Sequence, residues 1–160
     1  MPSSFLVADS GPLIALAIAN LLPAIEKQYQ ALIVPEAVLD ECLLNKNEPG
    51  AQQIQAALDL GHIKAVATAA LETTEIGVGE ASVIHYAKAN KLTALIDDKR
   101  AIAVAKRLDV TVVRSGAILV DLKRRGAIPA IKPVLDAWQQ HGYFLAHTVR
   151  AALLAQAGEF

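Results

Sequence analysis

Cysteine is nearly absent from this chain of 160 residues, with Cys42 as the only one. A single thiol forms no internal disulfide, so a disulfide-held scaffold is excluded and a reducing, intracellular setting is expected. Long apolar runs are absent too. The longest uncharged one begins near Pro12, is interrupted by Asn20 and ends at Leu22, which is short of the roughly 20 residues of a membrane span. Residues 1–4 lack the basic start of a secretory signal, so a cytoplasmic location without membrane contact is expected.

Aromatic residues make up only 4% of the chain, which weakens the case for a surface that stacks bases on exposed rings. An excess of positive charge is also missing, because 15 basic residues face 16 acidic ones and the net charge is −1. Nucleic-acid-binding domains are usually basic. The charge is unevenly spread, however: residues 1–87 hold 3 basic and 10 acidic groups, and residues 88–132 hold 11 and 4. Bound cations could cancel the acidic charge while the basic segment faces phosphates, so a nucleic-acid substrate is not excluded.

What the chain has in abundance is apolar residues, at 54%, which argues against disorder. The length and the lack of a Pro/Gly/Ser-rich linker indicate one domain over residues 1–160, with C-terminal helices from about residue 131. Short apolar runs predict five strands: Phe5–Asp9, Leu32–Val34, Ile63–Ala67, Thr93–Ile96 and Thr111–Val113. Helical segments are predicted between and after them, with Ser10 as the cap of the first and Pro35 as the first helical residue of the third. Their expected ranges after the first are about Leu22–Gln28, Pro35–Asn45, Pro49–Leu60, Gly79–Asn90, Lys99–Leu108, Ser115–Arg125, Ile131–His141 and Thr148–Ala157. This alternation indicates an α/β fold, a three-layer sandwich around a parallel sheet of about five strands.

Carboxylates follow two of the predicted strands: Asp9 the first, and Asp97 and Asp98 the fourth. Parallel α/β sheets bind ligands at the carboxyl ends of their strands, where the strand order reverses. Glu41, inside one predicted helix, and Glu80, in the first turn of another, could face the same crevice. Each acid alone has an ordinary explanation as a helix cap, a first-turn acid or a solvated side chain.

The combination of acids suggests a metal site, because clustered carboxylates repel one another unless cations neutralise them. Ligand sets made only of oxygen suit Mg²⁺ or Mn²⁺. One or two such ions can activate water, orient a phosphate and stabilise a leaving oxygen. That chemistry is phosphodiester hydrolysis.

Four segments of the sequence resemble the motifs of PIN-domain nucleases, in the right order and over residues 5–140. They are Val7-Ala8-Asp9-Ser10-Gly11-Pro12-Leu13-Ile14, Val34-Pro35-Glu36-Ala37-Val38-Leu39-Asp40-Glu41, Gly77-Val78-Gly79-Glu80-Ala81 and Leu95-Ile96-Asp97-Asp98-Lys99-Arg100. The resemblance is closest to a branch of bacteria and archaea related to VapC toxins of toxin–antitoxin modules.

The resemblance implies a Rossmann-like sheet, metal-dependent RNA cleavage, frequent homodimers and, as a toxin, an antitoxin protein as partner. It implies that Asp9, Glu41, Glu80 and Asp98 are the catalytic acids. Asp9, Asp98 and Glu80, with Asp97 beside them, are then the expected ligands of Mg²⁺ or Mn²⁺.

Three positions depart from the usual family pattern. Gly11 stands where a hydroxyl residue is common, so Ser10 is expected to supply that hydroxyl to the substrate. The third acid is Glu80 rather than aspartate, and Ile96 replaces a Thr or Ser. Either member of the Asp97–Asp98 pair could therefore face the site. An alternative function follows from these departures, namely a catalytically weak PIN-like module that binds RNA or a protein.

The basic residues after the acid pair, Lys99 and Arg100, are expected either to contact substrate phosphates or to be ordinary surface charges. Three aromatic residues near the C-terminus are expected in the core or an interface: Trp138, Tyr143 and Phe144. Cys42 is expected to be a buried thiol.

Overall fold

The computed structural model describes residues 5–160 and contains one parallel sheet of five strands. The strands are β1 (Phe5–Ala8), β2 (Ala31–Pro35), β3 (Lys64–Val66), β4 (Thr93–Leu95) and β5 (Val112–Val113). They are ordered β3-β2-β1-β4-β5, and every neighbouring pair is parallel. The predicted α/β fold and its five strands are thus confirmed.

The central strand β1 is buried on both faces, because Leu6, Val7 and Ala8 are all fully enclosed. A parallel strand covered by helices on both sides needs such an unbroken apolar run. The strands at the two edges of the sheet are less buried: Lys64 and Ala65 of β3 are exposed. Burial therefore increases from the edges towards β1, which begins the site described below.

Nine helices surround the sheet within residues 5–160, each within a few residues of its predicted place. They are α1 (Ser10–Ile18), α2 (Leu22–Tyr29), α3 (Glu36–Leu43), α4 (Ala51–Asp59), α5 (Val78–Asn90), α6 (Lys99–Arg107), α7 (Ser115–Arg124), α8 (Lys132–Gln140) and α9 (His147–Gln156).

Several helix starts differ from the predictions by one or two residues, and three of these differences follow from the local backbone. Asp9, not Ser10, holds the cap position of α1, and Ser10 is its first helical residue. Pro35 ends β2 and caps α3 instead of opening that helix, because its backbone is extended. The next helix starts at Ala51 rather than Pro49, since Gly50 before it has a φ of +84°, a left-handed conformation that suits glycine.

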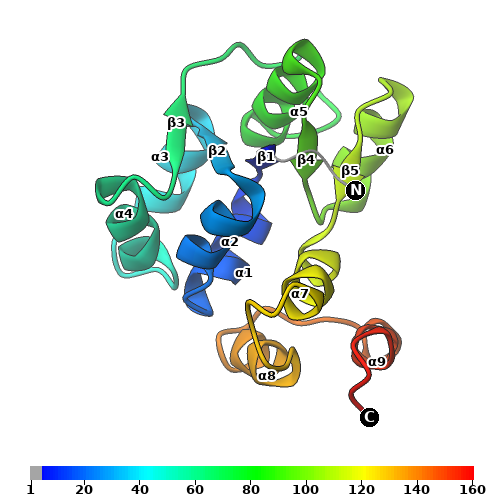
Figure 1. The fold of residues 1–160 in the computed structure, drawn as a ribbon. Coiled ribbons are helices and arrows are strands. Elements are labelled where there is room, and N and C mark those ends of the chain that lie inside the picture. The colour runs from blue at the N-terminus through cyan, green and yellow to red at the C-terminus, as the bar shows by residue number, and fades with distance from the viewer. Residues whose placement is uncertain (1–4) are drawn as a thin grey trace.

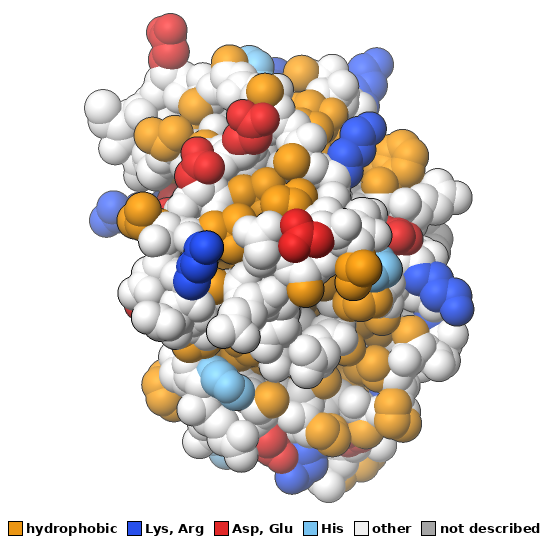
Figure 2. All heavy atoms as spheres, turned by 90° about the vertical axis from the view of Figure 1, so that its left-hand side faces the viewer, with side chains coloured by type: hydrophobic (Ala, Val, Ile, Leu, Met, Phe, Trp, Pro, Cys, Tyr) orange, Lys and Arg blue, Asp and Glu red, His pale blue; other side chains and the backbone are white. Residues whose placement is uncertain are grey.

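The helices form a layer on each side of the sheet (Figure 1). Helix α5 packs against β1, β2 and β4, with α6 beside it. Helices α1 and α7 lie on the other side and contact each other, while α8 contacts α1 and α9 contacts α7. One cluster of buried apolar residues extends from Leu6 to Leu153. The side of the molecule with β3, α3 and α4 carries both acidic and basic side chains, separated by uncharged ones (Figure 2).

Specific contacts attach the C-terminal helices to the rest of the molecule. The buried Trp138 indole N–H donates to the Ala15 carbonyl oxygen at 2.7 Å. Gly116 lets α9 approach α7 closely, because a Cβ there would lie 2.7 Å from Leu153 Cδ1. Trp138 is thus in the core, as predicted. Among residues 5–160, no helix has the length and apolar character that crossing a bilayer requires.

Candidate active site

The carboxyl edge of the sheet brings Asp9 close to the Asp97–Asp98 pair. Asp9 follows β1, and the pair follows β4, the parallel neighbour of β1. The Asp9 backbone N–H donates to the Leu95 carbonyl oxygen at 3.1 Å, which fixes the two strand ends side by side. The strand order reverses here, because β2 and β3 lie on one side of β1 and β4 and β5 on the other. Ligands of open parallel sheets bind at this reversal.

A pocket of about 270 Å³ opens at this edge, and we call it the acidic pocket. Its acidic lining residues are Asp9, Glu41, Glu80, Asp97 and Asp98, so the structure brings all the predicted acids together. The other lining residues are Ser10, Gly11, Pro12, Gly77 and Gly79. Most of them belong to the starts of α1 and α5, where the partial positive charge of a helix N-terminus offsets part of the negative charge.

Asp9 is the most buried of these acids, with 5% of its surface exposed. It holds the cap position of α1, yet its side chain makes no capping hydrogen bond. Its buried Oδ1 atom has no hydrogen-bond partner among residues 5–160. Burial raises the pKa of Asp9 to about 7, the backbone N–H of Ser10 opposes this rise, and the charges of Glu80, Glu41 and Asp98 add to it. A buried oxygen without a partner is costly in a folded protein, so simple helix capping does not account for Asp9.

The raised pKa makes Asp9 a source of pH-dependent instability in the metal-free protein. Because the folded state holds the proton more tightly than the unfolded chain, the stabilisation is complete below about pH 4 and lost as the pH rises through about 7. As the pH rises from 4 to 8, we therefore expect the unfolding free energy of the wild type to fall by about 1–4 kcal/mol relative to that of the Asp9→Asn variant. Urea unfolding of both proteins with a chelator present measures this difference. A difference that stays constant with pH would contradict the burial of a titrating Asp9.

Glu41, from the last turn of α3, lies across a glycine from Asp9. A Cβ on Gly79 would lie 3.4 Å from Glu41 Oε2 and 3.9 Å from Asp9 Oδ1. It would also lie 3.4 Å from a methyl group of Val38. Glycine at this position thus keeps a small space open between two carboxylates.

Glu80 and Asp98 come from the starts of α5 and α6. Burial raises the pKa of Glu80, the N–H of Gly77 opposes the rise, and the carboxyl groups of Asp98 and Glu41 increase it. Both acids also support their own helices: Glu80 Oε1 accepts the Gly77 N–H at 3.2 Å, and Asp98 Oδ2 accepts the Ala101 N–H at 2.9 Å. Their helix-terminal roles, considered from the sequence, are therefore present together with their place in the pocket.

Asp97 differs from Asp98 because its carboxylate is engaged elsewhere. Its Oδ1 accepts the backbone N–H of Ser115 at 2.9 Å, and its Oδ2 accepts the Ser115 hydroxyl at 2.6 Å and the Tyr143 hydroxyl. The charge of Asp98, by contrast, contributes to the raised pKa of Asp9. Asp97 thus connects the end of β4 to α7 and to the segment before α9.

The four acids Asp9, Glu41, Glu80 and Asp98 fit a hard divalent cation by their chemistry. All donors are carboxylates, which suit Mg²⁺ or Mn²⁺. A cation next to the unpartnered Oδ1 of Asp9, in the space that Gly79 keeps open, would neutralise the clustered negative charge. In their present positions, no three Asp, Glu, His or Cys side chains within residues 5–160 are close enough to hold an ion. Glu41 and Asp98 are the exposed acids among these four.

The predicted substrate-binding residues are more spread out. Ser10 lines the acidic pocket, Lys99 lines a neighbouring groove, and Arg100 is exposed on the first turn of α6. Sequence reasoning missed Arg114, whose Nη2 donates to the Asp97 carbonyl oxygen at 2.9 Å. Arg114 directly follows β5, so the strand-end argument that found Asp9 could have found it too. Cys42 is buried, as predicted.

Comparisons with known proteins give one family match. A family model described as "DUF3368: PIN domain" matches residues 5–159. No curated protein matches the chain. Among solved structures, the chain is similar to a PilT N-terminus domain protein from the hyperthermophilic archaeon Sulfolobus solfataricus P2, with 17% identity and a TM-score of 0.49 over 73% of this chain and 92% of that one. Because the family model spans both the sheet and every residue of the acidic pocket, this chain belongs to the PIN-domain family.

Proposed function

We propose that this PIN domain is an endoribonuclease that hydrolyses RNA phosphodiester bonds at the acidic pocket with Mg²⁺ or Mn²⁺. One observation carries the proposal: the buried Asp9 carboxylate, whose Oδ1 has no partner among residues 5–160, faces three further acids at the reversal point of the sheet. PIN domains are in general metal-dependent nucleases, which agrees with this use of the pocket.

The residues of the pocket have distinct roles in this proposal. When bound, a divalent cation supplies charge neutralisation and activation of water. Asp9 and Asp98 would hold the cation, and Glu41 and Glu80 would complete its site and orient water there. The Ser10 hydroxyl and the N-terminus of α1 face the phosphate, because helix N-termini favour anions. Asp97 is not a ligand in this assignment but holds the turn that presents Asp98.

The experiment is cleavage of a mixed RNA pool by the purified protein, with Mg²⁺ or Mn²⁺ and with a chelator. We expect fragments with either ion and intact RNA with the chelator. Intact RNA under all conditions, together with measurable RNA binding, would instead favour the catalytically weak binding module. This second candidate function is motivated by one observation: within residues 5–160, no three Asp, Glu, His or Cys side chains lie close enough together to hold an ion.

We further propose that the nuclease acts as the toxin of a toxin–antitoxin pair, as a homodimer in the cytoplasm restrained by an antitoxin protein. Growth arrest on expression of this chain alone would support the role. Normal growth, combined with RNA cleavage by the purified protein, would remove the toxin role and retain the nuclease.

A further inference from the structure

A second and larger opening adjoins the acidic pocket, and we call it the side groove. Its volume is about 630 Å³, compared with about 270 Å³ for the acidic pocket. It is lined by Asp97 in the turn after β4, the first residue of α6, β5, the start of α7, the segment before α9, and α9 itself. Asp97 lines both openings, so the side groove leads directly away from the proposed site of cleavage.

The side groove combines exposed apolar and basic side chains. Phe144 is 74% exposed and Val149 is 46% exposed, so the lining offers apolar surface to a ligand. Lys99 and Arg114 supply two exposed positive charges in the same lining. The hydrogen bond from Arg114 to the Asp97 carbonyl oxygen orients its guanidinium group beside the acidic pocket.

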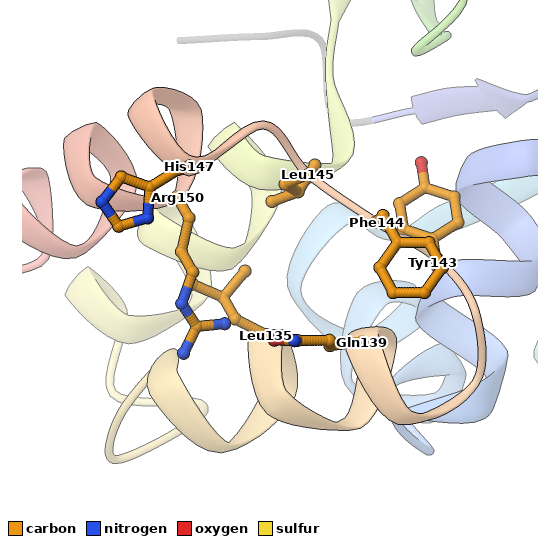
Figure 3. A pocket seen from close by; sticks show the side chains of 7 residues that line it. All are labelled: Leu135, Gln139, Tyr143, Phe144, Leu145, His147 and Arg150. Carbon is orange, nitrogen blue, oxygen red and sulfur yellow. The ribbon is translucent and has the colours of Figure 1, made fainter.

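The neighbouring aromatic residue, Tyr143, explains why Phe144 faces outward. Tyr143 packs edge-to-face on Trp138, with ring centroids 5.2 Å apart, and its hydroxyl donates to Asp97. This anchors the connection between α8 and α9 and leaves the next ring, Phe144, at the surface. Figure 3 shows Phe144 on this connection, where it also lines a smaller cavity of about 210 Å³ between α8 and α9.

We propose that the side groove binds an unpaired segment of the RNA next to the scissile phosphate. One base stacks on the Phe144 ring, and the neighbouring phosphates face Lys99 and Arg114. This inference rests on the proposed function, which it deepens by assigning the side groove to the strand beside the cleaved bond. Proteins that bind single strands combine a cationic groove with aromatic platforms in this way.

An exposed apolar groove could also bind a protein partner. The RNA segment is favoured for two reasons. Two cationic side chains, Lys99 and Arg114, line the groove together with its apolar residues and match the charge of phosphates. The groove also shares Asp97 with the pocket that would hold the scissile phosphate. A base inside a duplex has no free face for a ring, so duplex RNA should not use this groove.

The test measures binding of a fluorescein-labelled single-stranded RNA of about 10 nucleotides, with the Asp9→Asn substitution in every protein to prevent cleavage. We expect Phe144→Ala to weaken binding by roughly 5- to 150-fold, the usual effect of losing one stacked base. Phe144→Trp should retain binding, because it keeps a ring. Phe160→Ala is the matched control, since Phe160 is a fully exposed ring at the C-terminus. An abasic nucleotide at one position of the RNA should reproduce the loss and make Phe144→Ala harmless.

Several results would overturn the inference. The first is that Phe144→Ala binds the RNA as tightly as the protein that keeps Phe144. A change of particle mass in light scattering without a change of RNA affinity would assign the groove to a protein interface. An equal loss with duplex RNA would exclude stacking. If the wild type cuts no RNA but binding depends on Phe144, the side groove is supported and the nuclease function is refuted. If the wild type cuts RNA and Phe144→Ala leaves cleavage unchanged, the nuclease function is supported and the side groove is refuted.

Discussion

Replacing Asp9 with asparagine is expected to reduce metal-dependent RNA cleavage by roughly 100-fold or more. Asparagine has the shape of aspartate but lacks its charge, so the pocket loses its most buried cation ligand. Metal ions contribute several kcal/mol of charge stabilisation to such reactions, and each 1.4 kcal/mol or so corresponds to a factor of ten in rate. Single-turnover cleavage of a labelled RNA at saturating enzyme measures this effect without a contribution from product release.

Two controls separate this effect from unfolding. The Asp9→Asn variant should be at least as stable as the metal-free wild type at pH 8, because it removes a buried carboxyl whose pKa is raised. The Asp40→Asn variant changes an exposed acid one residue before Glu41 and should cleave at the wild-type rate. Cleavage by Asp9→Asn within a few-fold of the wild type would rule out Asp9 as the principal ligand.

Exchanging the two adjacent aspartates for asparagine is expected to give opposite results. Asp98→Asn should lower cleavage by roughly 100-fold and leave the fold intact, since asparagine caps a helix as well as aspartate does. Asp97→Asn should destabilise the protein by about 1–3 kcal/mol, because charge-assisted hydrogen bonds from Ser115 and Tyr143 are weakened.

Thermal unfolding and cleavage rates, measured on the same two variants, distinguish the roles. For a domain of this size, the Asp97 change corresponds to a melting temperature lower by roughly 3–10 °C. If Asp97→Asn lost cleavage with no loss of stability, and Asp98→Asn kept its cleavage, the assignment of the two residues would have to be reversed.

The sheet and its acidic edge could be predicted from the sequence because the residue patterns that mark them are local. An unbroken apolar run such as Phe5–Ala8 marks a buried parallel strand, and a carboxylate directly after it lies at the edge where ligands bind. That argument located Asp9 and the Asp97–Asp98 pair, and the alternation of elements placed Glu41 and Glu80 on helices that reach the same crevice. Helix starts were less accurate, since they depend on single backbone angles such as the left-handed one at Gly50.

The direction of each side chain could not be predicted, because it depends on residues distant in the sequence. Asp97 turns towards Ser115 and Tyr143, which are 18 and 46 positions away, and no spacing rule connects them. The aromatic content of 4% argued against base stacking. That count said nothing of position, and one exposed ring, Phe144, lies in the groove beside the acidic pocket.

A calorimetric titration with Mn²⁺ tests the central claim most directly, namely that Asp9 and the three carboxylates of Glu41, Glu80 and Asp98 form one divalent-cation site. The wild type at pH 8 should bind Mn²⁺ more tightly than millimolar, and the Asp9→Asn variant should lose that binding while Asp40→Asn retains it. Binding no tighter than millimolar in the wild type, or equal binding in the Asp9→Asn variant, would contradict the account.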